Sequence, residues 1–168
     1  MHKKHSAWIL TLLLSLLSAA VVPKASAQGT STLEERARWG EITHKLERNP
    51  LDESANKDGE WALNRLNDAH DIHVPLCSSL LVELNDAKYK YRHEIVRQYM
   101  LASGAFLIEN PTKAGDTHAM NVAAVESVLK VYSAILQQKS DAKWKPLDDL
   151  VKKQSQGKLD DALRKQCK

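Results

Sequence analysis

The chain has 168 residues, with 24 Lys and Arg, 21 Asp and Glu, and two cysteines. Three of the lysines lie within the first 27 residues, which contain no acid, so the rest of the chain carries 21 basic and 21 acidic residues. This balance excludes the broadly basic surface on which nucleic-acid binding depends, and we expect no nucleic-acid partner. The length suits one globular domain with a modest core.

The N-terminus has the pattern of a secretory signal peptide. The basic start His2-Lys3-Lys4-His5 precedes an apolar run from Ala7 to Val22, and Ala25-Ser26-Ala27 supplies the small residues that a signal peptidase recognises. Cleavage there would make Gln28 the first residue of the mature chain. A retained membrane anchor is the alternative, although the run is barely as long as the roughly 20 residues that span a bilayer. We therefore expect export, and no transmembrane segment in residues 28–168.

Helical patterns follow directly after the leader. A capping box at Ser31-Thr32-Leu33-Glu34, or the overlapping one from Thr32 to Glu35, begins the first predicted helix, which ends at Asn49-Pro50. A second helix is expected from about Leu51 to Ile72. A third begins at Ser78-Ser79, and whether it breaks before the next helix stays open.

The stretch from Tyr91 to Glu109 is expected to form the central helix. Its C-terminal half is apolar on every side, as in helices that other helices enclose. The small residues from Ala102 to Ala105 would let neighbouring backbones approach closely. We expect the ring of Phe106 to be buried in this core.

The last third of the chain continues the helical pattern. A clean apolar stripe predicts a helix from about Thr117 to Gln138, Pro146 opens a short helix, and Gly157 separates it from a final one that ends near Cys167. These elements predict an all-α fold over residues 28–168. We expect a single compact domain of six or seven helices, arranged as a bundle or an array of helical hairpins.

Two resemblances bear on the class of protein. Asn49-Pro50 and Asn110-Pro111 each separate two helices, a helix–proline turn–helix arrangement weakly similar to tetratricopeptide arrays. Their separation of 61 residues differs from that repeat of about 34. The leader together with the block from Trp61 to Pro111 resembles small exported bacterial helical proteins without an assigned activity. This resemblance implies a periplasmic or secreted location and no particular functional residue.

The strongest group of potential metal ligands lies near the end of the second predicted helix. His70 and His73 would point to one side of that helix, Cys77 follows closely, and His118 has the phase to approach them from the fifth helix. The spacing differs from His-Glu-x-x-His and lacks its glutamate. We therefore favour histidines that finish a helix, and keep a metal-binding protein or hydrolase as the alternative function. No cofactor is expected.

Acidic and basic groups elsewhere have structural interpretations. Glu109 ends the apolar helix and would be a candidate general acid if it were buried. The tail from Ala142 to Lys168 has eight basic and four acidic residues, with Trp144 between two lysines. Contact with anionic lipid is one interpretation of this tail. A solvated surface is the one we favour, because the charges are mixed along the helices.

The two cysteines are expected to form a disulfide. Cys77 and Cys167 are the only pair, and the leader sends both to a compartment in which disulfides persist. The alternative leaves Cys77 as a buried thiol and Cys167 free to join two chains. A bridge within the chain would fasten a short terminal helix to the middle of the fold.

These observations favour an exported helical binding or assembly protein with an unknown protein or peptide partner. A groove between helix pairs, lined by Trp61, Tyr89 and Tyr91, is the expected binding surface. A structural envelope protein that associates with itself through an apolar patch is a second alternative. No recognisable catalytic motif favours an enzyme.

Overall fold

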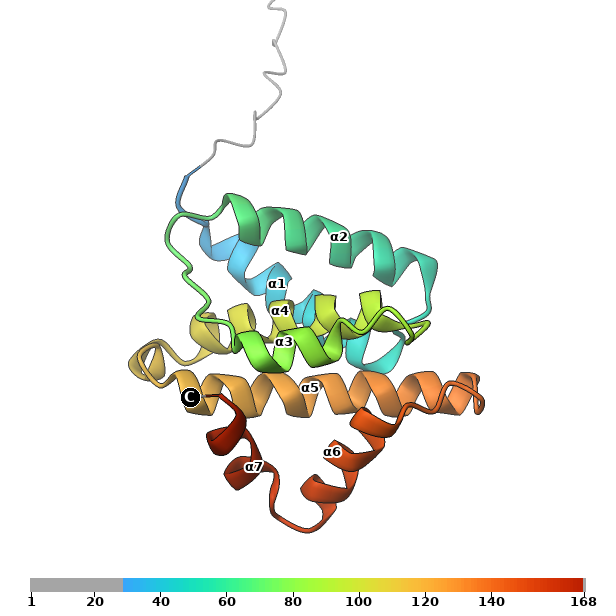
Figure 1. The fold of residues 1–168 in the computed structure, drawn as a ribbon. Coiled ribbons are helices and arrows are strands. Elements are labelled where there is room, and N and C mark those ends of the chain that lie inside the picture. Colours follow the sequence, from blue (N-terminus) through green and yellow to red (C-terminus); the bar gives the residue numbers. More distant parts are fainter. Residues whose placement is uncertain (1–28, 168) are drawn as a thin grey trace, which may run out of the picture.

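The computed structural model describes residues 29–167, so the expected signal peptide and the cleavage point before Gln28 lie outside the described residues. Figure 1 shows an arrangement of helices that cross and pack in one unit, which confirms the all-α prediction. The described residues form seven α-helices and one short 3-10 helix. They are α1 (Leu33–Arg48), α2 (Glu53–Asp68), α3 (Ser78–Leu84), α4 (Arg92–Glu109), η1 (Pro111–Lys113), α5 (Thr117–Gln138), α6 (Lys145–Ser155) and α7 (Leu159–Gln166).

The first helix begins at the second of the two expected capping boxes. The hydroxyl of Thr32 accepts a hydrogen bond from the backbone N–H of Glu35 (3.1 Å), and the Glu35 carboxylate accepts one from the Thr32 N–H (2.8 Å). Arg65 of α2 donates to the same carboxylate at 2.8 Å, and this bond is the main reason why the pKa of Glu35 falls to about 2. One side chain thus caps α1 and joins it to α2.

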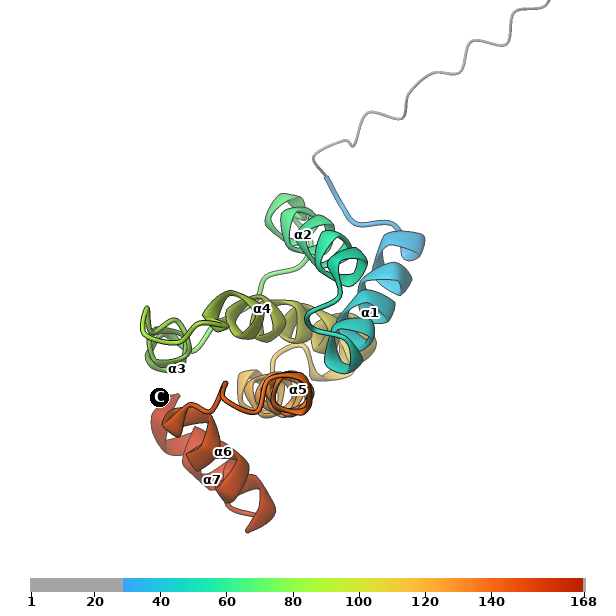
Figure 2. The same cartoon turned by 90° about the vertical axis from the view of Figure 1, so that its right-hand side faces the viewer.

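Helix α4 lies at the centre, as its composition predicts (Figures 1 and 2). On one side α1 and α2 pack against Leu101 and Ala105, and on the other α5 packs against Ile95 and Tyr99. Two hydrophobic clusters therefore share this helix. Because both its sides are covered, α4 buries apolar residues around most of its circumference.

The closest approach to α4 depends on a glycine. The indole ring of Trp39, from α1, is fully buried, and its Nε1–H donates to the carbonyl of Leu101 at 3.1 Å. A Cβ atom on Gly104 would lie 2.8 Å from the Trp39 atom Cζ2, inside van der Waals contact. The small residues of the central helix thus serve the close contact that the sequence predicts.

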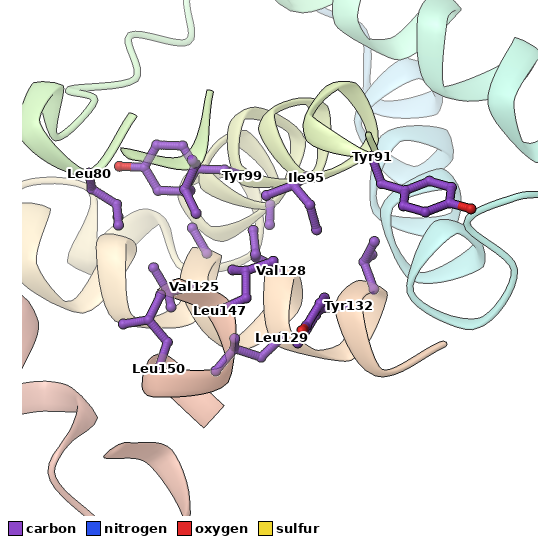
Figure 3. Packing of buried hydrophobic residues seen from close by; sticks show 14 of the residues in the cluster. Leu80, Tyr91, Ile95, Tyr99, Val125, Val128, Leu129, Tyr132, Leu147 and Leu150 are labelled. Carbon is purple, nitrogen blue, oxygen red and sulfur yellow. The ribbon is translucent and has the colours of Figure 1, made fainter. Parts of the chain in front are cut away.

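The second cluster joins α4 and α5 to the C-terminal helices. Helix α5 is long and apolar enough to cross a membrane by length and composition, and most of it is buried among the other helices. Figure 3 shows how side chains from α3, α4, α5 and α6 meet around it. Those labelled there are Leu80, Tyr91, Ile95, Tyr99, Val125, Val128, Leu129, Tyr132, Leu147 and Leu150.

Three expectations about these elements are corrected or settled. Helix α2 ends at Asp68 rather than near Ile72, because the chain after it turns to meet the N-terminal segment. Phe106 is only half-buried and belongs to neither hydrophobic cluster, so its ring does not hold the core. Helices α3 and α4 are separate, since residues 85–91 form a turn between them.

A disulfide fastens the C-terminal end, as we expected from the two cysteines of the sequence. Cys77 and Cys167 are bonded, with their Cα atoms 5.3 Å apart. The hydroxyl of Ser79 donates to the carbonyl of Gln166 at 2.7 Å and supports the same contact. Before this, α6 and α7 form a hairpin whose turn contains Gly157 at a φ of 65°, a left-handed conformation that favours glycine.

Candidate functional site

The segment between α2 and α3, residues 69–77, forms the rim of two neighbouring hollows, and we call it the strap. Its first part is held by the N-terminal segment. Gly29 pairs with Ala69 in a parallel β-bridge, and both the backbone N–H and the hydroxyl of Ser31 donate to Asp71 at 2.9 Å. Arg36 of α1 donates to Asp71 at 2.6 Å. Burial opposes ionisation of Asp71, but these hydrogen bonds outweigh it and lower its pKa to about 2.

The far end of the strap is held by the core. The backbone N–H of Cys77 donates to the hydroxyl of Tyr99 at 3.1 Å, and that hydroxyl donates to Asn121 at 2.5 Å. The disulfide to Cys167 adds a covalent anchor at the same residue. Both ends of the strap are therefore fixed to different helices, which restricts the conformations of the residues between them.

The middle of the strap leaves its main chain without internal partners. Within residues 29–167, no backbone–backbone hydrogen bond reaches the segment from Ile72 to Leu76. His73 and Pro75 are exposed, Val74 and Leu76 are half-buried, and Ile72 is buried. The main-chain groups of this segment therefore have no backbone partner among the described residues, and Pro75 has no N–H to donate.

Two hollows flank the strap and share Ile72, His73 and Ala114. The larger, of about 590 Å³, lies between the strap, α2 and α4. The smaller, of about 390 Å³, lies between the strap, α1 and the end of α4. We call the two together the strap groove. Its remaining lining residues are Arg36, Leu66, Asn67, Ala69, His70, Asp71, Val74, Pro75, Leu76, Met100, Leu107, Ile108 and Pro111.

The lining of the strap groove is suited to binding rather than to chemistry. Aliphatic side chains and Met100 dominate it, and its one charged pair, Arg36 with Asp71, is already used to hold the strap. His70 and His73 contribute imidazoles at the rim, where both are exposed. A mostly apolar hollow with a few polar groups at its edge is the usual form of a ligand site.

Neither the favoured histidines at the end of a helix nor the alternative metal-binding cluster is found among the described residues. His70 and His73 lie on the strap rather than on a helix, because α2 ends at Asp68, and the three-residue spacing therefore does not place them on one helical face. His118 lies on α5 and contacts Asp160 of α7 at 2.8 Å. In the described part of the chain, no group of three or more His, Cys, Asp or Glu residues is placed to hold a metal ion.

The expected aromatic binding surface is also corrected. Tyr89 and Tyr91 are buried, with exposed fractions of 4% and 8%. Tyr89 stacks on Trp144 with ring centroids 4.8 Å apart, so it packs the loop before α6 against the core. Burial raises the pKa of the Tyr89 hydroxyl well above its usual value. Trp61 is half-buried on α2 beneath the guanidinium of Arg38, at 3.9 Å, and packs against a different hydrophobic cluster from the two tyrosines.

A second, polar hollow of about 210 Å³ lies between α1, α4 and α5. There the Ser127 hydroxyl donates to Glu47 at 2.7 Å, and His44 contacts the other oxygen of Glu47 at 3.2 Å. Because the Ser127 hydroxyl donates to a carboxylate rather than to the imidazole, this is not the serine–histidine arrangement of a nucleophile. Glu109 at its rim is about half exposed and lies 3.7 Å from His44, so the burial that would make it a candidate general acid is not present.

The strap itself was missed, although the sequence contains a signal for it. Ile72, Val74 and Leu76 alternate with His73 and Pro75, and this period of two is typical of an extended segment with one inward face. His70 and His73 were interpreted instead as the end of a helix or as possible metal ligands. The groove beside the strap has no such signal, because it depends on Met100, Leu107 and Ala114 from later elements.

The comparisons with known proteins do not assign this chain to a class. No protein-family model matches the chain, and neither the curated proteins nor the solved structures gave a match. The fold and the site define an all-α domain with an open, largely apolar groove beside an anchored strap.

Proposed function

We propose that the protein is an exported bacterial binding module that holds an extended apolar peptide segment of a partner protein in the strap groove. The observation that carries this proposal is the free main chain from Ile72 to Leu76 beside an apolar hollow. A peptide laid along the strap would form main-chain hydrogen bonds, as in recognition by strand addition, and place alternate side chains in the hollow. Pro75 limits this pairing because it has no N–H.

The strap already accepts an extended neighbour at one end. Gly29 pairs with Ala69 through the main chain, and the bridge is parallel. A partner peptide would continue the same kind of pairing further along the strap. Because the strap is fixed by Asp71 and Cys77, little conformational freedom is lost when the peptide binds, and this favours affinity.

The size of the groove fits a few peptide side chains. Its larger hollow, of about 590 Å³, lies within the range of about 300–1,000 Å³ that is usual for ligand sites. Each aliphatic side chain that becomes fully buried there would contribute roughly 1.5–3 kcal/mol. We therefore expect peptides with Leu, Ile or Val at alternate positions to bind, and strongly charged peptides to be rejected.

The test is selection from a displayed library of random linear peptides, followed by affinity measurement with the enriched sequences. Val74→Lys would place an ammonium in the groove and should weaken binding at least about tenfold, or about 1.4 kcal/mol. Val82→Lys is the matched control, because Val82 lies on α3, outside the groove lining, and is 76% exposed. Enriched peptides that bind both variants equally, or no enrichment at all, would contradict the proposal.

Export is the second half of the proposal and has its own measurement. The leader pattern and a disulfide between the two cysteines both support it. The intact mass of protein recovered from the periplasm or medium should correspond to a chain that begins at Gln28. Recovery of the uncleaved chain in an inner-membrane fraction would favour the retained anchor instead.

A further inference from the structure

A cluster of positive charge lies at the turn of the α6–α7 hairpin, far from the strap in sequence. Figure 1 shows this hairpin on the side of α5 that faces away from α1 and α2. Every residue from 151 to 158 is exposed. This stretch, which we call the hairpin tip, contains Lys152, Lys153 and Lys158 and no acid, and it also exposes Val151 at 40%.

Two of the acids that flank the hairpin tip, Asp149 and Asp160, are paired with basic side chains outside it. Asp149 accepts from Lys145 at 2.6 Å, and Asp160 pairs with Arg164 at 3.2 Å and with His118 at 2.8 Å. Acidic and basic residues that alternate in the tail sequence therefore occupy different places in the structure. Asp149 and Asp160 are neutralised along the sides of the two helices, and the charge of Lys152, Lys153 and Lys158 remains at the end.

The lysines of the hairpin tip have no such partners. Within residues 29–167, no carboxylate lies within 4.0 Å of the ammonium groups of Lys152, Lys153, Lys158 or Lys165. Lys153 and Lys158 of the tip, together with Lys165 of α7, line an open groove of about 610 Å³ between α6 and α7, with Asp161 as its one acid. The other lining residues of this groove are Ala162 and Gln166.

We propose that the hairpin tip docks on the anionic phospholipid surface of a membrane. Charge complementarity carries this assignment, because unpaired lysines at a projecting turn can approach a flat anionic surface together. Each lysine near such a surface contributes roughly fivefold to partitioning, and the attraction acts within about one screening length. The groove between α6 and α7 gives lipid phosphates room to approach Lys153, Lys158 and Lys165.

Nucleic acid fits the same charge less well. Duplex binders commonly neutralise 6–10 phosphates over a broad surface, and single-strand binders stack bases on exposed aromatic rings. The tip has few lysines and no aromatic residue between 151 and 158. Residues 28–168 carry 21 basic and 21 acidic residues, so no excess positive charge over the whole of this part adds to the charge of the tip.

The experiment is co-sedimentation of the protein, as it is recovered after expression of the full chain, with vesicles. Vesicles containing phosphatidylglycerol should retain the protein, and vesicles of phosphatidylcholine alone should not. The triple variant Lys152→Gln/Lys153→Gln/Lys158→Gln should lower partitioning on the order of a hundredfold. In about 1 M salt, where the screening length is about 3 Å, the wild-type protein should be released as well.

The matched control removes the same charge elsewhere. Lys88→Gln/Lys113→Gln/Lys139→Gln replaces three exposed lysines in other turns and should leave partitioning nearly unchanged. Equal losses in both triple variants would show a general charge effect and overturn the proposal. Absence of retention on phosphatidylglycerol vesicles, or binding to polyglutamate or duplex DNA in its place, would overturn it too. Peptide binding in the strap groove is measured without vesicles, so the two proposals can fail separately.

Discussion

Removing the Cys77–Cys167 disulfide should lower the free energy of unfolding by about 4–5 kcal/mol without unfolding the protein. The two cysteines are 90 residues apart in sequence, and the chain-entropy model assigns a closed loop of that length roughly this stabilisation. The gain arises mainly because the bridge restricts the unfolded chain. Strain and residual structure reduce such values in practice, so the upper end is a limit.

The native fold should survive the loss because α7 has other contacts. Leu159 and Leu163 are buried against the core, and the bond from Ser79 to Gln166 remains. These contacts predict that Cys167→Ser keeps its helical circular dichroism at room temperature. They also predict that α7 frays first on heating, as a helix of eight residues is marginal alone.

The assay is urea unfolding, followed by circular dichroism, of the wild type with and without reductant and of Cys167→Ser. Reductant should shift the wild-type midpoint to that of the variant and leave the variant unchanged. A difference in unfolding free energy below about 1 kcal/mol would refute the loop-entropy reasoning. Two titratable thiols in the oxidised monomer would refute the bridge itself.

Three further outcomes test the fold. Gly104→Val should cost at least about 2 kcal/mol in urea unfolding, because its Cβ would meet Trp39 at 2.8 Å, whereas Gly115→Val, with open space around it, should cost little. Tyr89→Phe should raise the free energy of unfolding by about 1 kcal/mol, because the buried hydroxyl has no hydrogen-bond partner among the described residues, and an unchanged or lower midpoint would contradict this. The depressed pKa of Asp71 stabilises the fold above about pH 4, and this contribution of about 2 kcal/mol should disappear as the pH falls toward 2. Asp71→Asn should therefore be less stable at pH 7 and depend less on pH in that range.

Local chemistry made most of the helices predictable. The capping box at Thr32 and the apolar stripe from Thr117 to Gln138 are encoded within a few turns, and both helices have the bounds that their patterns predict. The sequence allowed two overlapping capping boxes, and the helix begins at the one from Thr32 to Glu35. The end of α2 depended instead on Ser31 and Arg36, which are distant in sequence, and its position was predicted wrongly.

Burial of individual side chains was harder to predict than the helices. Arg97 is buried at 3% exposure, where it binds Glu60 of α2, whereas Phe106 is left half-exposed near the end of the same helix. From the type of side chain alone, one would expect Phe106 to be buried and Arg97 to be exposed. The outcome is set by which helix crosses α4 at which turn, and a single sequence does not contain that information in readable form. The groove beside the strap was out of reach for the same reason.

The two ends of the described chain are fastened to the same short segment. Ser31 is bonded to Asp71, and Cys167 is bonded to Cys77, six residues further along the strap. A pulling force applied between the ends would therefore pass from one end to the other through the strap, and the helices between them would bear little of it at first. The hydrogen bonds at Asp71 would yield before the disulfide, since they are much weaker than a covalent bond. Tension on this protein would thus distort the strap before it unfolds the core.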